Sequence, residues 1–282
     1  MYQTYDDYWL AHHGVLGMHW RQRNGPPYPL GSDISTGHRL KSCAAGKPTV
    51  KKDESKVKTN RTIKASVNSG IGLKPKTRTY TMDEDIAAVN PKYNPDAKTD
   101  KEYNAYCMNC CYCTTAYEMR RRGYDVKAKP RNDDEKYQAL TGWRWNPHEQ
   151  MFDYKGEVRT RGFGASDDLD HHPLKKPLLT KYVYNMTRSV KTAIINMPDN
   201  ARGILTLDWY YGGGHSLNFE KSGNDIFVID PQSNEKWNIG GNNRPQDTWV
   251  DKSDYMALVG NIWVTRLDDL DVIPGKIKGA CS

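Results

Sequence analysis

The residues of this 282-residue chain best suited to chemistry are a histidine, an aspartate and a group of cysteines. Residues 212–220 and 225–232 read as two short strands around a Ser222-Gly223 turn, the pattern of a β-hairpin. With this two-residue loop Phe219 faces Ile226, and His215 lies directly opposite Asp230, with roughly 5 Å between their Cβ atoms. On the hairpin alone, a surface His–Asp pair without function is the commoner case. Together with a nucleophile, the same pair predicts an imidazole oriented by a carboxylate.

The nucleophile is expected among four cysteines that lie within seven positions, namely Cys107, Cys110, Cys111 and Cys113. Asn109 is suited to cap a helix that starts at Cys110. The positive end of a helix dipole favours a thiolate, the reactive form of cysteine, so Cys110 is the first candidate and Cys113, one turn later, the second.

Three alternative roles for the cysteines stay open. One or two of them are expected to be buried as small apolar residues. A zinc site at Cys107-x-x-Cys110 would need a second pair, and only the adjacent His171-His172 is at hand. A redox pair of Cys110 and Cys113 would need an apolar strand before it, whereas residues 101–106 are polar. We therefore expect no metal and no cofactor.

The helices and strands that must position these residues are predicted from the spacing of apolar residues and from the residues that commonly start and end helices. Helices are predicted at 82–89, at 110–122 with Gly123 as C-cap and three arginines on its last turn, and at 181–197. Strands are predicted at 124–128, at 203–209 leading into the hairpin, and at 261–267. Residues 130–177 contain many turn formers and are expected to be loops.

Composition limits the class of protein. Apolar residues make up 37% of the chain, the mean hydropathy is −0.85, and no run approaches the length of a membrane span. The first nine residues are acidic and aromatic, which does not resemble a secretory signal. The clustered cysteines do not form the spaced pairs of a disulfide framework, so we expect a reducing compartment and a cytoplasmic or virion-associated protein without a membrane contact.

The net charge of +7 is concentrated near the N-terminus. Residues 39–78 contain twelve basic and two acidic residues, a net charge of +10 that leaves about −3 for the rest of the chain. Such a segment can bind nucleic acid, but it lacks interleaved aromatic residues, and we expect a solvated linker instead. The predicted division is a short apolar docking segment at 1–30 with its core at Trp9–Arg23, a basic flexible linker at 31–80, and a compact domain at 81–282.

Five groups of residues together resemble the papain-like toxin domain of polymorphic toxins and phage-borne proteins, whose relatives include protein-glutamine deamidases. They occur in the family's order and spacing, from about residue 83 to residue 270. They are Asn90-Pro91, Asn109-Cys110-x-x-Cys113, the run from Ala116 to Val126, Gly214-His215, and Asp230-Pro231-Gln232. A short N-terminal segment, His12–Met18, is similar to one found near the start of several phage structural proteins.

The resemblance implies an α+β, papain-like cysteine-enzyme fold, with the nucleophile helix packed on a small antiparallel sheet and a largely disordered basic region before it. It implies Cys110 as nucleophile, His215 as general base and then acid, and Asp230 as the group that orients the imidazole. Gln232 would lie on the strand face of Asp230 and assist or replace it.

Residues that come before and within the start of the hairpin are the expected substrate contacts: Trp209, Tyr211, Gly213 and Gly214. The expected reaction is deamidation of a glutamine on a target protein, or cleavage of a peptide bond. The alternative function is a virion or assembly protein, with the domain as an inactive packing module and the Trp9–Arg23 segment contacting capsid proteins.

Overall fold

The computed structural model describes residues 71–131, 151–155, 160–164, 176–209, 214–253, 256 and 259–282. The Trp9–Arg23 segment, most of the basic linker, the His171-His172 pair, and the predicted substrate contacts Tyr211 and Gly213 lie outside these residues.

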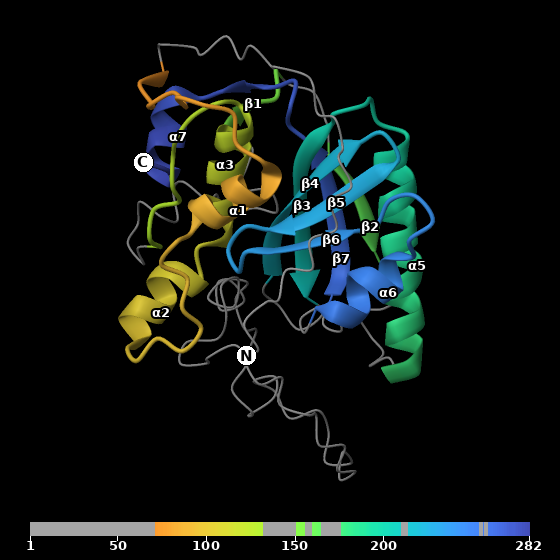
Figure 1. Ribbon diagram of the computed structural model, residues 1–282. Helices are drawn as coiled ribbons and strands as arrows, with labels where there is room; N and C mark the ends of the chain where they lie inside the picture. Colours follow the sequence, from red (N-terminus) through yellow and green to blue (C-terminus); the bar gives the residue numbers. More distant parts are fainter. Residues whose placement is uncertain are drawn as a thin grey trace, which may run out of the picture.

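The described chain is an α+β fold around one six-stranded antiparallel sheet (Figure 1), with the strand order β2-β7-β3-β4-β5-β6. The strands are β2 (Thr160–Gly164), β3 (Arg202–Trp209), β4 (Gly214–Ser222), β5 (Asp225–Asp230), β6 (Glu235–Asn238) and β7 (Val259–Arg266). A separate two-stranded pair joins β1 (Phe152–Asp153) to β8 (Asp271–Val272). The helices are α1 (Met82–Val89), α2 (Asp100–Cys107), α3 (Cys110–Arg121), α5 (Lys176–Ile195), α6 (Pro245–Thr248), the 3₁₀ turn η5 (Val250–Lys252) and α7 (Pro274–Ala280).

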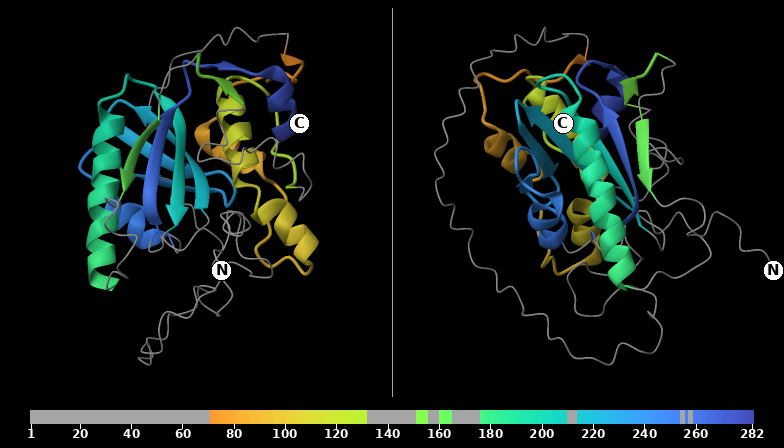
Figure 2. Two further views of the ribbon diagram at one scale, coloured as in Figure 1. Left: turned by 180° about the vertical axis from the view of Figure 1, so that it is seen from behind. Right: turned by 90° about the vertical axis from the view of Figure 1, so that its right-hand side faces the viewer.

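Helices cover both faces of the sheet (Figures 1 and 2): α1, α3 and α7 lie on one side, and α5 and α6 on the other. Side chains alternate along each strand, so each face has its own core. Ile204 and Ile229 pack with Ala116 and Met119 of α3, whereas Leu205, Leu217, Phe219 and Val228 pack with buried residues of α5. The buried positions of α5 include Val183, Met186, Val190 and Ile194, which confirms the predicted helical spacing.

The predicted hairpin is present as β4 and β5, but its register differs from the expected one. Ser222 pairs with Asp225, so the loop is Gly223-Asn224, and Phe219 pairs with Val228 instead of Ile226. Gly223 has a φ of +58°, which a glycine at the first central position of a two-residue hairpin loop adopts without strain. The shift is by two residues, and an even shift leaves every side chain on the predicted face.

Most of the predicted helices and strands are confirmed, and three expectations are wrong. The polar chain before Cys110, which the sequence indicated to be a loop, contains α2, whose N-cap Thr99 accepts a hydrogen bond from the N–H of Glu102. Residues 124–128 form only isolated bridges, Pro75 with Tyr124 and Ala128 with Cys281, and no strand. The region expected as loops contributes the edge strand β2. Sequence reasoning also missed α6, α7 and β6, which are short.

The three arginines at the end of α3 form buried ion pairs. Arg120 and Arg121 both bind Asp85 of α1, at 3.0 and 3.1 Å, and Asp85 is fully buried. Arg121 also binds Glu220 of β4 at 2.7 Å. Arg122 binds Glu118 at 2.8 Å, and Glu118 in turn binds Arg202 of β3 at 3.1 Å. This ion-pair network ties the last turns of α3 to α1 and to the sheet.

Residues 71–80, which the sequence placed in the linker, contact the folded part of the chain. Ile71 is buried in the core beside α3, and the ammonium of Lys76 pairs with Asp85. The division of the rest of the chain into segments stays a prediction.

Candidate active site

The cysteine cluster lies at the start of α3, as predicted, with Cys110 as its first residue. Asn109 occupies the N-cap position, but its side chain makes no cap hydrogen bond. Its Oδ1 accepts from the Cys113 thiol at 3.2 Å and from Asn90 at 3.4 Å, and its Nδ2 donates to the carbonyl of Lys129 at 3.1 Å. The prediction that the Asn109 side chain caps the helix is therefore wrong. Instead this side chain links the start of α3 to Asn90 and to Lys129.

His215 and Asp230 are hydrogen-bonded to each other, although they are not directly opposite in the ladder, which ends at the pair Asn218–Ile229. The Nε2 of His215 lies 2.8 Å from Oδ2 of Asp230, and the two side chains are 10% and 4% exposed. The other oxygen of Asp230 accepts from the backbone N–H of Gln232 at 3.0 Å and of Ser233 at 3.3 Å. Asp230 is thus fixed by the turn that follows β5, and it leaves Nδ1 of His215 for another partner.

Cys110 is a neighbour of His215 that affects the pKa of its imidazole. Burial lowers the pKa of His215, but the charge and hydrogen bond of Asp230, followed by those of Cys110, outweigh burial and raise this pKa to about 10. A neighbour that raises the pKa of a histidine stabilises the imidazolium, as an anion does. The charge of Cys110 also raises the pKa of Cys111 and of Cys113.

All three cysteines of the first turn of α3 are buried, with Cys110 and Cys111 each 4% exposed. Cys113 is completely buried, and burial raises its pKa well above the ordinary value. The sulfur of Cys111 lies 3.6 Å from the hydroxyl of Ser216, and its pKa is raised well above the ordinary value by contact with Cys110 and by burial. Both are held as neutral thiols, which are poor nucleophiles.

Contacts along α3 and β4 show why the thiol and the imidazole meet. Cys111 contacts Ser216, the carbonyl of Thr114 accepts from Asn218 at 3.1 Å, and the hydroxyl of Tyr117 donates to Glu220 at 3.0 Å. Successive turns of α3 therefore follow successive positions of β4, so the two elements run in the same direction. Their first residues lie at the same end of the sheet.

Gln232 does not lie on β5, where the sequence placed it, but in the turn that follows. Its Nε2 donates to the carbonyl of Cys107 at 2.8 Å, and its own carbonyl accepts from Asn90 at 3.0 Å. Asn90, which also donates to the carbonyl of Tyr106 at 2.8 Å, is buried and was not predicted as a site residue. Gln232 and Asn90 connect the turn after Asp230 to the chain just before Cys110. The Asn90-Pro91 motif was a sequence signal for Asn90, but its partners were not evident.

The predicted substrate contacts are only partly described. Trp209 ends β3 and is half-buried. Gly214 pairs with Asp208 at the start of β4, and a Cβ on it would lie 2.2 Å from the carbonyl oxygen of Leu207. The close approach of the two strands accounts for this glycine without a substrate.

No group of three or more His, Cys, Asp or Glu side chains in the described part of the chain is arranged to hold a metal ion. The five cysteines described there are free thiols, Cys107, Cys110, Cys111, Cys113 and Cys281. Among the described helices, none has the length and apolar character needed to cross a membrane.

Comparison with known proteins gave one family. The family model described as papain fold toxin 1, glutamine deamidase, matches residues 108–235. The matched region contains α3, the β4–β5 hairpin and thus Cys110, His215 and Asp230. No curated protein and no solved structure matched the chain. The part of the chain that carries the cysteine helix and the histidine hairpin is therefore similar to the papain fold toxin family.

Proposed function

We propose that this protein is a cysteine-dependent acyl-transfer enzyme that deamidates a glutamine side chain on a target protein. The contact that carries this proposal is the one between Cys110 at the start of α3 and His215, with Asp230 on the far nitrogen of the imidazole. A nucleophile, a base and an orienting carboxylate in series make up the constellation of nucleophilic amide hydrolysis.

The reaction proceeds in two halves. The sulfur of Cys110 attacks the carbonyl carbon of the glutamine side chain, and the carbon–nitrogen bond breaks as His215 gives its proton to the departing ammonia. Water then adds to the thioester as His215 takes a proton from it. The carbon–sulfur bond breaks, which releases glutamate and restores the thiol.

Two features of the site support this order of reaction steps. With Asp230 as acceptor, Nε2 of His215 carries a hydrogen, which leaves Nδ1 as the nitrogen that exchanges a proton with Cys110. The developing oxyanion would lie near the backbone N–H groups at the start of α3, where helix geometry directs donors outward. Loss of a single donor of this kind costs about 3–4 kcal/mol of transition-state stabilisation.

Deamidation and peptide cleavage share every step except the identity of the leaving group. The description of the matched family as a glutamine deamidase favours deamidation. The implied partner is a target protein that presents an accessible glutamine.

Two measurements test the proposal. Intact-protein mass after brief iodoacetamide treatment near neutral pH should show one added group on Cys110, and this labelling should be lost in His215→Ala. Proteome-wide mass spectrometry of cells that express the protein should find glutamine-to-glutamate conversions that are absent with Cys110→Ala, whereas Cys281→Ala, which removes another buried thiol, should retain them. Equal labelling of all thiols would contradict the activation of Cys110. New peptide termini without deamidation would contradict deamidation as the reaction.

A further inference from the structure

A second hollow lies on the side of the sheet opposite to α3. It is a cavity of about 480 Å³ lined by one face of α5 and by the loop that leads into α6. The lining residues are Arg188, Lys191 and Thr192 of α5, and Asn242, Asn243, Arg244, Pro245 and Gln246 of the loop. Both elements lie on the far side of the sheet from the cysteine helix (Figure 1). We call this cavity the α5 groove.

The walls of the α5 groove are fixed by hydrogen bonds. The ammonium of Lys191 donates to the carbonyls of Gly241 and Asn243, at 2.9 and 2.6 Å. The N–H of Gly241 donates to the carbonyl of Asn224 in the hairpin loop at 2.7 Å. Because its shape is set before a ligand arrives, binding there has a small entropic cost.

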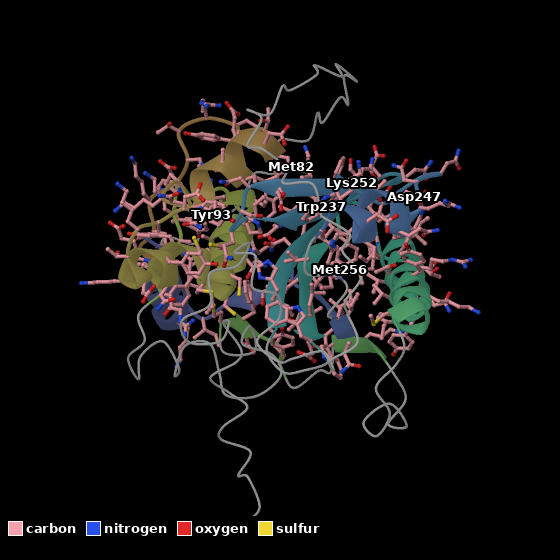
Figure 3. The ribbon with its side chains drawn as sticks, turned by 90° about the horizontal axis from the view of Figure 1, so that it is seen from below. Met82, Tyr93, Trp237, Asp247, Lys252 and Met256 are labelled. Atoms are coloured by element: carbon pink, nitrogen blue, oxygen red, sulfur yellow. The ribbon has the colours of Figure 1, made fainter. Side chains whose placement is uncertain are left out.

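The α5 groove is basic. The guanidinium of Arg188 is exposed and has no hydrogen-bond or ion-pair partner among the described residues. The guanidinium of Arg244 forms a bidentate ion pair with the carboxylate of Asp247, at 2.7 and 3.0 Å. The other nearby carboxylate, Asp251, accepts from the hydroxyl of Tyr184 at 2.8 Å. Asp247 lies beside α5, on the side of the molecule away from α1 and α2 (Figure 3). The α5 groove therefore offers the guanidinium of Arg188 to an anionic ligand.

One polar atom of the groove needs a donor. The Oε1 of Gln246 is buried and has no hydrogen-bond partner, and a buried acceptor left unsatisfied costs about 1–3 kcal/mol. A sulfate or chloride ion can bind Arg188, but it has no hydrogen to donate to Gln246. A peptide with acidic side chains offers both groups: carboxylates for the guanidinium and backbone N–H groups for the amide oxygen.

We propose that the α5 groove binds an acidic segment of a partner polypeptide. In this arrangement Arg188 pairs with a carboxylate of the segment, and Gln246 accepts from its backbone. Lys191 shapes the floor of the groove through its bonds to the loop. The groove lies across the sheet from the thiol, so a docked partner leaves the Cys110 site free.

Fluorescence anisotropy with a labelled peptide of alternating glutamate and serine tests this proposal on the full-length protein. Arg188→Glu reverses the charge of an exposed side chain, and we expect it to weaken binding at least tenfold. Gln246→Met should weaken peptide binding as well. Lys98→Glu makes the same charge change on an exposed lysine outside the groove and serves as the control. Circular dichroism melting should confirm that each variant is folded.

The results separate the possible ligands. Peptide binding that Arg188→Glu and Gln246→Met weaken, and that Lys98→Glu retains, supports the proposal. Absence of binding at low ionic strength overturns it, as does equal weakening by Arg188→Glu and Lys98→Glu, which would indicate only general charge attraction. Competition by inorganic phosphate at equal concentration would identify a site for simple anions instead. The active-site variant Cys110→Ala should bind the peptide normally, so this test does not depend on the proposed chemistry.

Discussion

Replacement of Asp230 by asparagine should disable the thiol without disturbing the turn that holds it. The side chain keeps its size, and Oδ1 can still accept from the N–H groups of Gln232 and Ser233. The amide nitrogen would now donate to Nε2 of His215, where the carboxylate accepts in the native protein. The hydrogen of the neutral imidazole then lies on Nδ1, so His215 cannot take a proton from Cys110.

The size of the effect follows from the pKa of His215. Its rise from 6.5 to about 10 corresponds to about 5 kcal/mol in favour of the imidazolium. At pH 8 such a group is about 99% protonated, whereas a histidine with an ordinary pKa is about 3% protonated. Asp230 is the largest cause that raises this pKa, so Asp230→Asn should reduce the thiolate–imidazolium pair at pH 8 by up to about thirtyfold.

The assay is the pH dependence of Cys110 alkylation by iodoacetamide, followed by mass spectrometry. In the native protein we expect a rate that stays nearly constant between about pH 6.5 and 9, because the imidazolium is fully formed over this range. In Asp230→Asn the rate should be low and should rise with pH as the thiol ionises unaided. The control is Asp225→Asn, at the other end of β5, where the carboxylate accepts from Asn238. Identical profiles for Asp230→Asn and the native protein, or an equal loss in Asp225→Asn, would refute the reasoning.

Three further predictions concern the helix that carries the thiol. Burial raises the pKa of Glu118, but the charges of Arg202 and Arg122 lower it by more, so the net shift is downward. The stability that this shift contributes is present above the ordinary pKa of glutamate and is lost as pH falls through the pKa in the folded protein. Urea unfolding of Glu118→Gln at a series of pH values should lack this part of the acid dependence. Gly123→Ala should lower the unfolding free energy by about 1–3 kcal/mol, because Gly123 has a φ of +98°; unchanged stability would contradict this. Cys113→Ser should leave Cys110 alkylation unchanged, and a large fall would instead favour Cys113 as the nucleophile.

The elements that position the site could be predicted because their signals are local. The helix at Cys110–Arg121 has Arg122 as its C-cap, where the sequence predicted Gly123, and Gly123 comes directly after it; the hairpin contains a Ser-Gly-Asn-Asp turn. The register was less accessible, since either Ser222-Gly223 or Gly223-Asn224 can form the loop. A glycine at the first central position with positive φ decides for the second. The even shift is the reason that His215 was placed on the correct face.

The side-chain partners could not be predicted, because they lie far apart in the sequence. Asparagine is a residue type that commonly caps helices. Nothing in the local sequence shows that the side chain of Asn109 instead forms hydrogen bonds with Cys113, Asn90 and Lys129. Arginines on a last turn are ordinarily attributed to the helix dipole. Their buried partners, Asp85 and Glu220, lie 35 and 99 residues from the arginines that bind them.

The position of the thiol depends on contacts at both ends of α3. By strand alternation His215 and Asp230 belong to the sheet face that packs on α5, whereas Ser216 and Asn218 contact α3. Cys110 therefore meets the imidazole where the β4–β5 ladder has ended, and a small slide of α3 along β4 would separate them. The ion pairs at the far end of the helix oppose that slide. Because a buried ion pair adds little net stability and breaking one is costly, their contribution here is to fix one position of α3.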